Sequence, residues 1–331
     1  MAEWLYEDGI GERRAALVAG ERIIAAEVER DDDGAGIGAV LSVRLIAHDR
    51  PRRRARVRCD DGSELWLAHP PATLTEGASV TAQVTRMALR EAARVKPGHA
   101  IVSDAAPHPA PALRARIAAT GHPIRDLRPA AIPDALEAAG WSDLLDAART
   151  GDWPFPGGAL AIALTPAMTL IDIDGDLAPA ELAEAGAHAA LSAITALGIT
   201  GSIGIDFPTL ASRPARQHID TLLGAGLTGT PGGAGEKTAM NGFGFVQIIR
   251  RRERPSLLER MQFEPVLGDA LTLLRQAERA IGAGALTLSS RPAVIDLLSA
   301  RPHWLAQVQQ RTGRAVTLTP VPSLKGCGHA Q

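Results

Sequence analysis

The chain has 331 residues, of which 46% are hydrophobic and 22% charged, and its formal net charge is −2. These proportions are typical of a globular protein with more than one core, and the charge gives no overall sign of nucleic-acid binding. Two cysteines, Cys59 and Cys327, are too few and too widely spaced for a disulfide framework or a cysteine zinc site. No signal-peptide pattern is present, and the longest apolar stretch, 159–171, is too short to span a bilayer. We therefore expect a cytoplasmic protein without a membrane partner.

From the N-terminus, apolar residues on either side of Gly20 predict a hairpin over 14–29, within a first unit of residues 1–34. Several short β-rich segments separated by turn residues follow, and they favour a small OB-type barrel over 35–105. Such a barrel could bind a single-stranded nucleic acid through Trp66, Arg56, Arg58 and Lys96. A core role explains Trp66 at least as well. The predicted strands are 39–47, 54–59, 64–68, 79–87 and 100–103.

Residues 106–156 are interpreted as a linker rich in proline and alanine, followed by helices over 113–119 and 133–149. Beyond them, two apolar strand-like segments, 168–175 and 202–207, each carry a carboxylate near their end. A helix predicted over 179–197 connects the two segments. A strand–helix–strand unit of this kind brings its two strands side by side in one sheet. Asp172 and Asp206 are therefore expected to lie a few ångströms apart.

Two ionised carboxylates at short range repel each other unless a cation neutralises them. An all-oxygen site suits Mg²⁺, which prefers a few carboxylates together with water and substrate phosphate. Asp172 and Asp206 are therefore the candidate magnesium ligands, with Asp174 beside them as a third candidate catalytic residue. The alternative is that each aspartate only caps the end of its strand.

Arginine greatly outnumbers lysine, and the arginines cluster in 52–58 and in 250–254. Arginine binds phosphate through paired hydrogen bonds and stacks on bases. Either run by itself is better explained as a solvated strand end. The run 250–254 lies close to the candidate metal site, however, and we therefore assign Arg250, Arg251, Arg252 and Arg254 to phosphate contacts.

Three segments carry a family resemblance. The first, Gly157-Gly-Ala-Leu-Ala-Ile-Ala-Leu-Thr-Pro-Ala-Met-Thr-Leu-Ile-Asp-Ile-Asp174, resembles the entry to the catalytic domain of the ribonuclease E/G family. There a Gly-Gly, a strand, an apolar turn and an Ile-Asp-Ile-Asn segment follow in that order. Gly204-Ile-Asp-Phe207 is similar to the family's second metal-ligand strand. The segment 240–257, with a Phe-Gly, an arginine-rich exit and a Pro-Ser-Leu, resembles the next strand.

The resemblance implies a magnesium-dependent endoribonuclease that cleaves single-stranded RNA in RNA processing or decay and leaves 5′-phosphate and 3′-hydroxyl ends. Asp172 and Asp206 would hold the Mg²⁺. The implied fold mixes α+β and α/β parts: a remnant RNase-H-like hairpin, an inserted OB-type RNA-binding barrel, a DNase-I-like mixed-sheet catalytic domain over 157–262 and a small α/β domain over 263–331. The expected RNA contacts are Arg250, Arg251, Arg252, Arg254, Phe243, Trp66, Arg56, Arg58 and Lys96. For Phe243, packing in the core is the favoured alternative.

The chain also departs from the family pattern. Asp174 stands where the family usually has Asn, so it keeps an acceptor but loses an amide donor. Gly242 stands where a basic residue is common. The zinc-link cysteines and the 5′-sensor segment are absent, so a zinc-link oligomer is not expected. A non-catalytic RNA-binding paralogue therefore stays open as the alternative. The glycine-rich segment 229–238 precedes a strand rather than a helix, and is interpreted as a loop rather than a P-loop.

Overall fold

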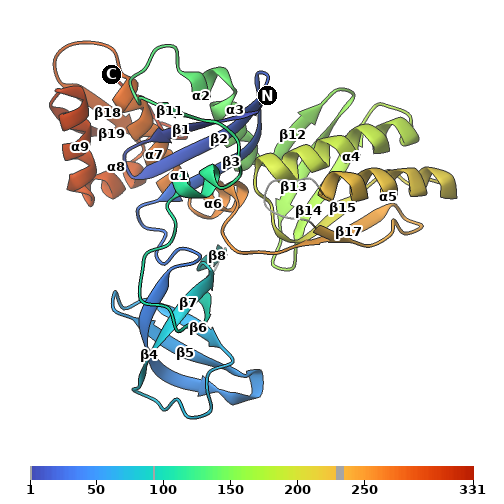
Figure 1. Ribbon diagram of the computed structural model, residues 1–331. Coiled ribbons are helices and arrows are strands. Elements are labelled where there is room, and N and C mark those ends of the chain that lie inside the picture. The colour runs from blue at the N-terminus through green and yellow to red at the C-terminus, as the bar shows by residue number, and fades with distance from the viewer. Residues whose placement is uncertain (1, 92–93, 229–234) are drawn as a thin grey trace.

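The computed structural model describes residues 2–91, 94–228 and 235–331; residues 229–234, most of the predicted glycine-rich loop, lie outside it. The described strands form a four-stranded sheet, a closed five-stranded barrel, a six-stranded sheet, a three-stranded sheet and a two-stranded ribbon. Figure 1 shows the barrel standing below the other sheets, which pack together with the helices above it. The prediction of a mixed α and β protein with a small barrel near its N-terminus is confirmed.

The N-terminal sheet contains the predicted hairpin, β2 and β3, and it also contains two strands that the sequence did not indicate. One of these, β11, follows the barrel in the chain and pairs in parallel with β1. Helix α1 packs Leu113 and Ile117 against Trp4 and Leu17 on one face of this sheet. The chain therefore leaves this unit to form the barrel and returns to complete it. The elements are β1 (Glu3–Asp8), β2 (Glu12–Ala19), β3 (Arg22–Arg30), α1 (Leu113–Ala118) and β11 (Ile124–Leu127).

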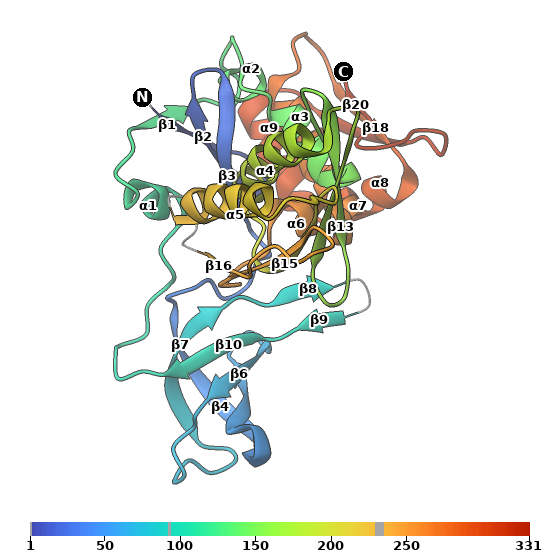
Figure 2. The same ribbon diagram turned by 90° about the vertical axis from the view of Figure 1, so that its right-hand side faces the viewer.

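The barrel closes in the order β10-β6-β5-β4-β7, and its five strands match the five predicted segments closely. Alternate residues such as Val43, Val57 and Leu67 fill its core, as expected for strands with one face inward. A short ribbon, β8 with β9, extends from it toward the six-stranded sheet (Figure 2). The elements are β4 (Val40–Asp49), the 3-10 turn η1 (Arg50–Arg52), β5 (Arg54–Cys59), β6 (Glu64–Ala68), β7 (Ser79–Arg86), β8 (Leu89–Glu91), β9 (Arg94–Lys96) and β10 (Gly98–Val102).

The six-stranded sheet has the order β12-β13-β14-β15-β17-β16, and Figure 1 shows helices α4 and α5 on the same side of it. Residues on the face toward these helices, among them Ile171, Ile203 and Val246, are buried. Their neighbours along the strands, among them Leu170 and Asp172, are exposed on the opposite face, which we call the open face. The elements are β12 (Asp152–Phe155), β13 (Gly158–Leu164), β14 (Thr169–Gly175), α4 (Pro179–Ala196), β15 (Gly201–Asp206), α5 (Arg213–Thr228), β16 (Gly235–Lys237) and β17 (Phe245–Arg250).

One predicted helix is interrupted. The helix expected over 133–149 is split at Gly140, whose φ of 91° lies in the left-handed region that favours glycine. In the C-terminal part, a break before Pro302 separates two helices, because proline cannot donate a helical hydrogen bond. The remaining elements are α2 (Ala135–Ala138), α3 (Trp141–Thr150), α6 (Leu257–Phe263), α7 (Pro265–Arg279), β18 (Leu286–Ser290), α8 (Pro292–Ser299), α9 (Pro302–Thr312), β19 (Val316–Pro320) and β20 (His329–Ala330).

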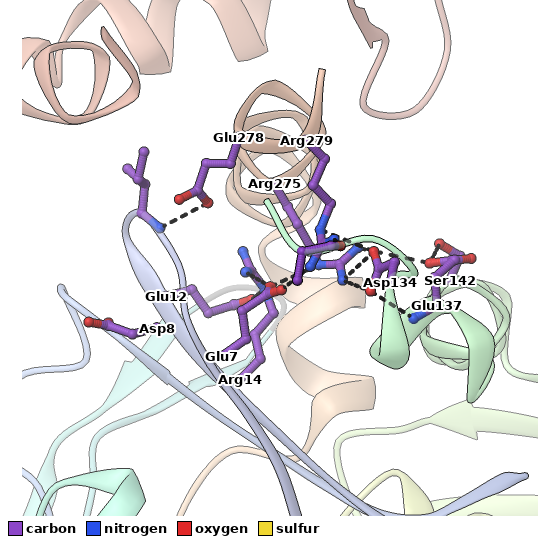
Figure 3. Close-up of polar contacts among 12 residues, drawn as sticks. Glu7, Asp8, Glu12, Arg14, Asp134, Glu137, Ser142, Arg275, Glu278 and Arg279 are labelled. Carbon is purple, nitrogen blue, oxygen red and sulfur yellow. Dashed lines mark hydrogen bonds and ion pairs between the residues drawn. The ribbon is translucent and has the colours of Figure 1, made fainter. Parts of the chain in front are cut away.

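A network of buried charges joins the N-terminal sheet to α7 and α2 (Figure 3). Glu7 is fully buried, and its carboxylate accepts hydrogen bonds from Arg14 at 2.8 Å and from Arg275 at 3.0 Å. Arg275 also donates two bonds of 2.8 Å to Asp134, and Arg279 contacts both Glu7 and Asp134. These groups neutralise one another inside the protein, so we assign them to holding the two units together.

Among the helices of the described residues, none is both long and apolar enough to cross a membrane.

Candidate functional site

The open face carries three aspartates where β14 and β15 run side by side. Asp172 is in register with Asp206 on the neighbouring parallel strand, and adjacent strands lie about 4.8 Å apart. Asp174 is two residues further along β14 and therefore on the same face. All three side chains are exposed to solvent. The sheet thus gathers the three predicted catalytic carboxylates on one surface.

The electrostatics of these carboxylates are unfavourable in the absence of a cation. Loss of solvent raises the pKa of Asp172 above its ordinary value of 3.8, and the negative charges of Asp174 and Asp206 raise it further. Within the described part of the chain, none of the three forms an ion pair with an arginine, lysine or histidine. The open face therefore holds concentrated negative charge that a bound cation would relieve.

The carboxylates of the open face supply part of the oxygen ligands that a magnesium ion requires. No three His, Cys, Asp or Glu side chains of the described residues converge in a group that could hold a metal ion alone. Mg²⁺, however, keeps several waters and is commonly held by one or two carboxylates together with substrate phosphate. Asp172 and Asp206, in register and without a cationic partner in the described chain, fit that smaller donor set.

An aromatic side chain missed by the sequence analysis lies beside the carboxylates. Phe245 on β17 is paired in register with Asp206. A Cβ atom added to Gly204 would lie 2.5 Å from Cζ of Phe245, so the half-buried ring lies across Gly204 on the open face. A glycine inside a strand often marks such a close approach, and this was the available signal.

Phe243 lies in the turn that precedes β17, and it is 84% exposed. The side-chain oxygen of Asn241 accepts hydrogen bonds from the backbone N–H groups of Phe243 and Phe245, at 2.9 and 3.0 Å. The carbonyl of Gly244 accepts a bond of 3.2 Å from the N–H of Phe207, which directly follows Asp206. The alternative that Phe243 packs in the core is therefore wrong, and an ordered turn presents its ring to solvent.

The arginine run 250–254 is largely occupied with internal contacts. Arg250 is only 2% exposed, and its guanidinium donates a hydrogen bond of 2.9 Å to the carbonyl of Ile199. The prediction that Arg250 contacts RNA is therefore wrong, because its charged group faces the protein interior. Arg254 pairs with Glu27 at 3.1 Å, and Arg252 pairs with Glu259. Arg251, which pairs with Glu253 at 2.9 Å, is the well-exposed member of the run.

On the barrel, Trp66 lies half-buried on the outer surface, between the core residues Leu65 and Leu67 of β6. The guanidinium carbon of Arg54 is 3.7 Å from the centroid of its ring, a cation–π contact. A core role for Trp66 is therefore wrong. The other predicted barrel contacts are half-exposed or exposed and carry acidic partners: Arg56 and Arg58 both pair with Glu64, and Lys96 pairs with Glu91.

No protein-family model and no curated protein sequence matches this chain.

Proposed function

We propose that this chain is a magnesium-dependent endoribonuclease of the ribonuclease E/G type, with a DNase-I-like catalytic sheet that cuts single-stranded RNA. The observation that carries the proposal is the register of Asp172 with Asp206 on an open sheet face, with Asp174 beside them. Carboxylates that repel one another at the surface of a sheet cost stability, and carboxylates perturbed in this way cluster at functional sites.

The side chains of the open face have separate roles in phosphodiester hydrolysis. Asp172 and Asp206 would hold the ion, which when bound supplies charge neutralisation at the scissile phosphate and an activated water. Asp174 has only acceptor oxygens when ionised, so it orients a water molecule by accepting its hydrogen bond. Phe245 and Phe243 give flanking bases an apolar surface on which to stack, which favours a single strand over a duplex.

The test is cleavage of a labelled single-stranded RNA by the purified chain, with Mg²⁺ and with EDTA. Cleavage should require Mg²⁺ and leave 5′-phosphate ends that a ligase accepts. Asp206→Asn keeps the shape of the side chain and removes its charge, so cleavage should fall by at least about 100-fold, or roughly 2.7 kcal/mol in the transition state.

Asp176→Asn is the matched control, because Asp176 is an exposed acid just beyond the end of β14. It should leave cleavage unchanged. If wild type, Asp206→Asn and Asp176→Asn all cut equally, the activity belongs to a contaminant and the proposal fails.

The second candidate is a non-catalytic RNA-binding module. It is favoured by one observation, that the described residues offer no complete set of three metal-ligating side chains. This module would bind the same RNA with or without Mg²⁺ and leave it intact. Measuring RNA binding by fluorescence anisotropy beside the cleavage assay separates the two functions.

A further inference from the structure

A pocket lies on the barrel, where the connection from β4 to β5 meets the end of β6. It has a volume of about 290 Å³, at the small end of the range for ligand sites. Its ionisable lining residues are all bases: His48, Arg50, Arg53, Arg54 and His69. Arg53 and Arg54 of the run 52–58 therefore line one cavity together with Arg50.

The pocket has more positive charge than its neighbours neutralise. Asp49 accepts a hydrogen bond of 2.9 Å from Arg54 and offsets that charge. Arg50 and Arg53 form no ion pair with any described residue. Two arginine charges at the pocket are thus uncompensated, and a ligand that neutralises both must carry a charge close to −2.

The backbone around the pocket is held in a strained arrangement. Arg53 and His69 both have φ of +48°, and within the described residues they are the two non-glycine residues in the left-handed region. The N–H of His69 donates a hydrogen bond of 2.9 Å to the carbonyl of Arg53. The N–H of Arg53 in turn donates one of 3.0 Å to the carbonyl of Arg50. Such residues cost about 1–3 kcal/mol each and tend to occur where a ligand is held. These hydrogen bonds fix the backbone from which the exposed side chains of Arg50, Arg53 and His69 project.

We propose that this pocket binds a dianionic phosphate group, either as free inorganic phosphate or as the phosphate monoester of a nucleotide. At neutral pH a monoester carries about −1.5 to −2 charges and three terminal oxygens. The guanidinium group matches such oxygens through paired hydrogen bonds. A phosphodiester or a carboxylate carries one charge and would leave the second arginine unneutralised. The proposal is independent of the aspartates on the open face.

The test is titration calorimetry at low salt with inorganic phosphate, with AMP and with the dinucleotide ApA, whose single phosphate is a diester. EDTA is present, so that no metal on the aspartates can attract the anion. Phosphate or AMP should bind with one site per chain, and ApA at least tenfold more weakly. AMP binding tenfold tighter than phosphate identifies a nucleotide as the ligand, and equal affinities identify the free anion.

The variants localise the binding. Arg53→Gly suits the positive φ while it removes the charge, and Arg50→Ala removes the other uncompensated charge; each should weaken binding at least tenfold. Arg52→Ala is the matched control, because Arg52 lies in the same turn, pairs with Asp49 and does not line the pocket. Circular dichroism of each variant checks its fold. The proposal is overturned if neither anion binds at millimolar concentration, if ApA binds as tightly, or if Arg52→Ala weakens binding as much as the other two variants.

Discussion

At the scale of single residues, the open face is organised around like charges that the fold does not neutralise. Loss of solvent raises the pKa of Asp172, and the negative charges of Asp174 and Asp206 raise it further. A raised carboxyl pKa means that ionisation disfavours the folded state. This cost is absent below the ordinary value of 3.8 and fully present once the pH exceeds the raised folded-state pKa. Above that pH, the apparent affinity for a cation should be at its highest.

Asp172→Asn should therefore stabilise the metal-free protein, by about 0.5 kcal/mol, the size expected for exposed charge interactions. It should also abolish stabilisation by Mg²⁺. In wild type an ion present at ten times its dissociation constant adds about 1.4 kcal/mol. Thermal unfolding with EDTA and with Mg²⁺ measures both effects. Equal Mg²⁺ stabilisation of wild type and variant would remove Asp172 from the metal site.

Phe243 allows a residue-scale test of base stacking. Its ring is 84% exposed, so Phe243→Ala should leave the free energy of unfolding unchanged within about 0.5 kcal/mol. Binding of a single-stranded RNA should weaken by about 1–3 kcal/mol, the usual value of one base–aromatic contact, and Phe243→Tyr should restore it. Anisotropy titrations at fixed salt provide the measurement. If Phe243→Ala binds RNA as wild type does, the strand follows another path.

At the scale of elements, the turn between β16 and β17 connects the exposed Phe243 to β15, the strand that carries Asp206. Gly244 has φ of +94°, and a Cβ atom there would lie 2.4 Å from the carbonyl oxygen of Phe207. Gly242, two residues earlier, has open space around it and no positive φ. Of these two glycines in one short turn, the backbone conformation and the close contact therefore require glycine at 244 but not at 242.

Gly244→Ala should destabilise the protein by at least about 1–3 kcal/mol, because it combines a left-handed backbone with a backbone clash. It should also reduce RNA cleavage, because Gly244 accepts a hydrogen bond from Phe207, the residue that directly follows Asp206 at the end of β15. Gly242→Ala should be neutral in both respects. Urea unfolding and the cleavage assay on the two variants provide the comparison. A neutral Gly244→Ala would show that this turn does not support the site.

At the scale of the whole molecule, the buried charge network couples the N-terminal sheet to the C-terminal helices (Figure 3). Burial by itself would raise the pKa of Glu7. The charges of Arg14 and Arg275, with the hydrogen bond from Arg279, outweigh burial and lower it below 4.5. A lowered carboxyl pKa contributes stability above the unfolded value of 4.5, and that stability is lost as the pH falls through the folded-state pKa.

Glu7→Gln should destabilise the protein by about 3–5 kcal/mol at pH 7, because it removes the buried negative charge that Arg14, Arg275 and Arg279 share and leaves three buried guanidinium groups with fewer acids than they need. The difference from wild type should shrink as the pH falls below 4.5. Glu3→Gln on the same strand is the control, since Glu3 makes an exposed pair with Arg125 and should cost no more than about 1 kcal/mol. Urea unfolding at several pH values tests both. A small, pH-independent effect of Glu7→Gln would contradict the assigned role.

The sequence by itself determined the local pattern of this protein. Alternating apolar residues located the barrel strands, and the spacing of Asp172 and Asp206 around one helix placed them on neighbouring strands, because periodicity and short connections are local properties.

Only the tertiary structure decided which side chains are accessible. Arg250 and Arg251 are adjacent in one charge run, yet the first is buried and the second exposed. Phe243 and Trp66 could equally have been core residues by type. The pairing of β11 with β1 joins segments far apart in the chain, and a strand's residue pattern does not specify its distant partner.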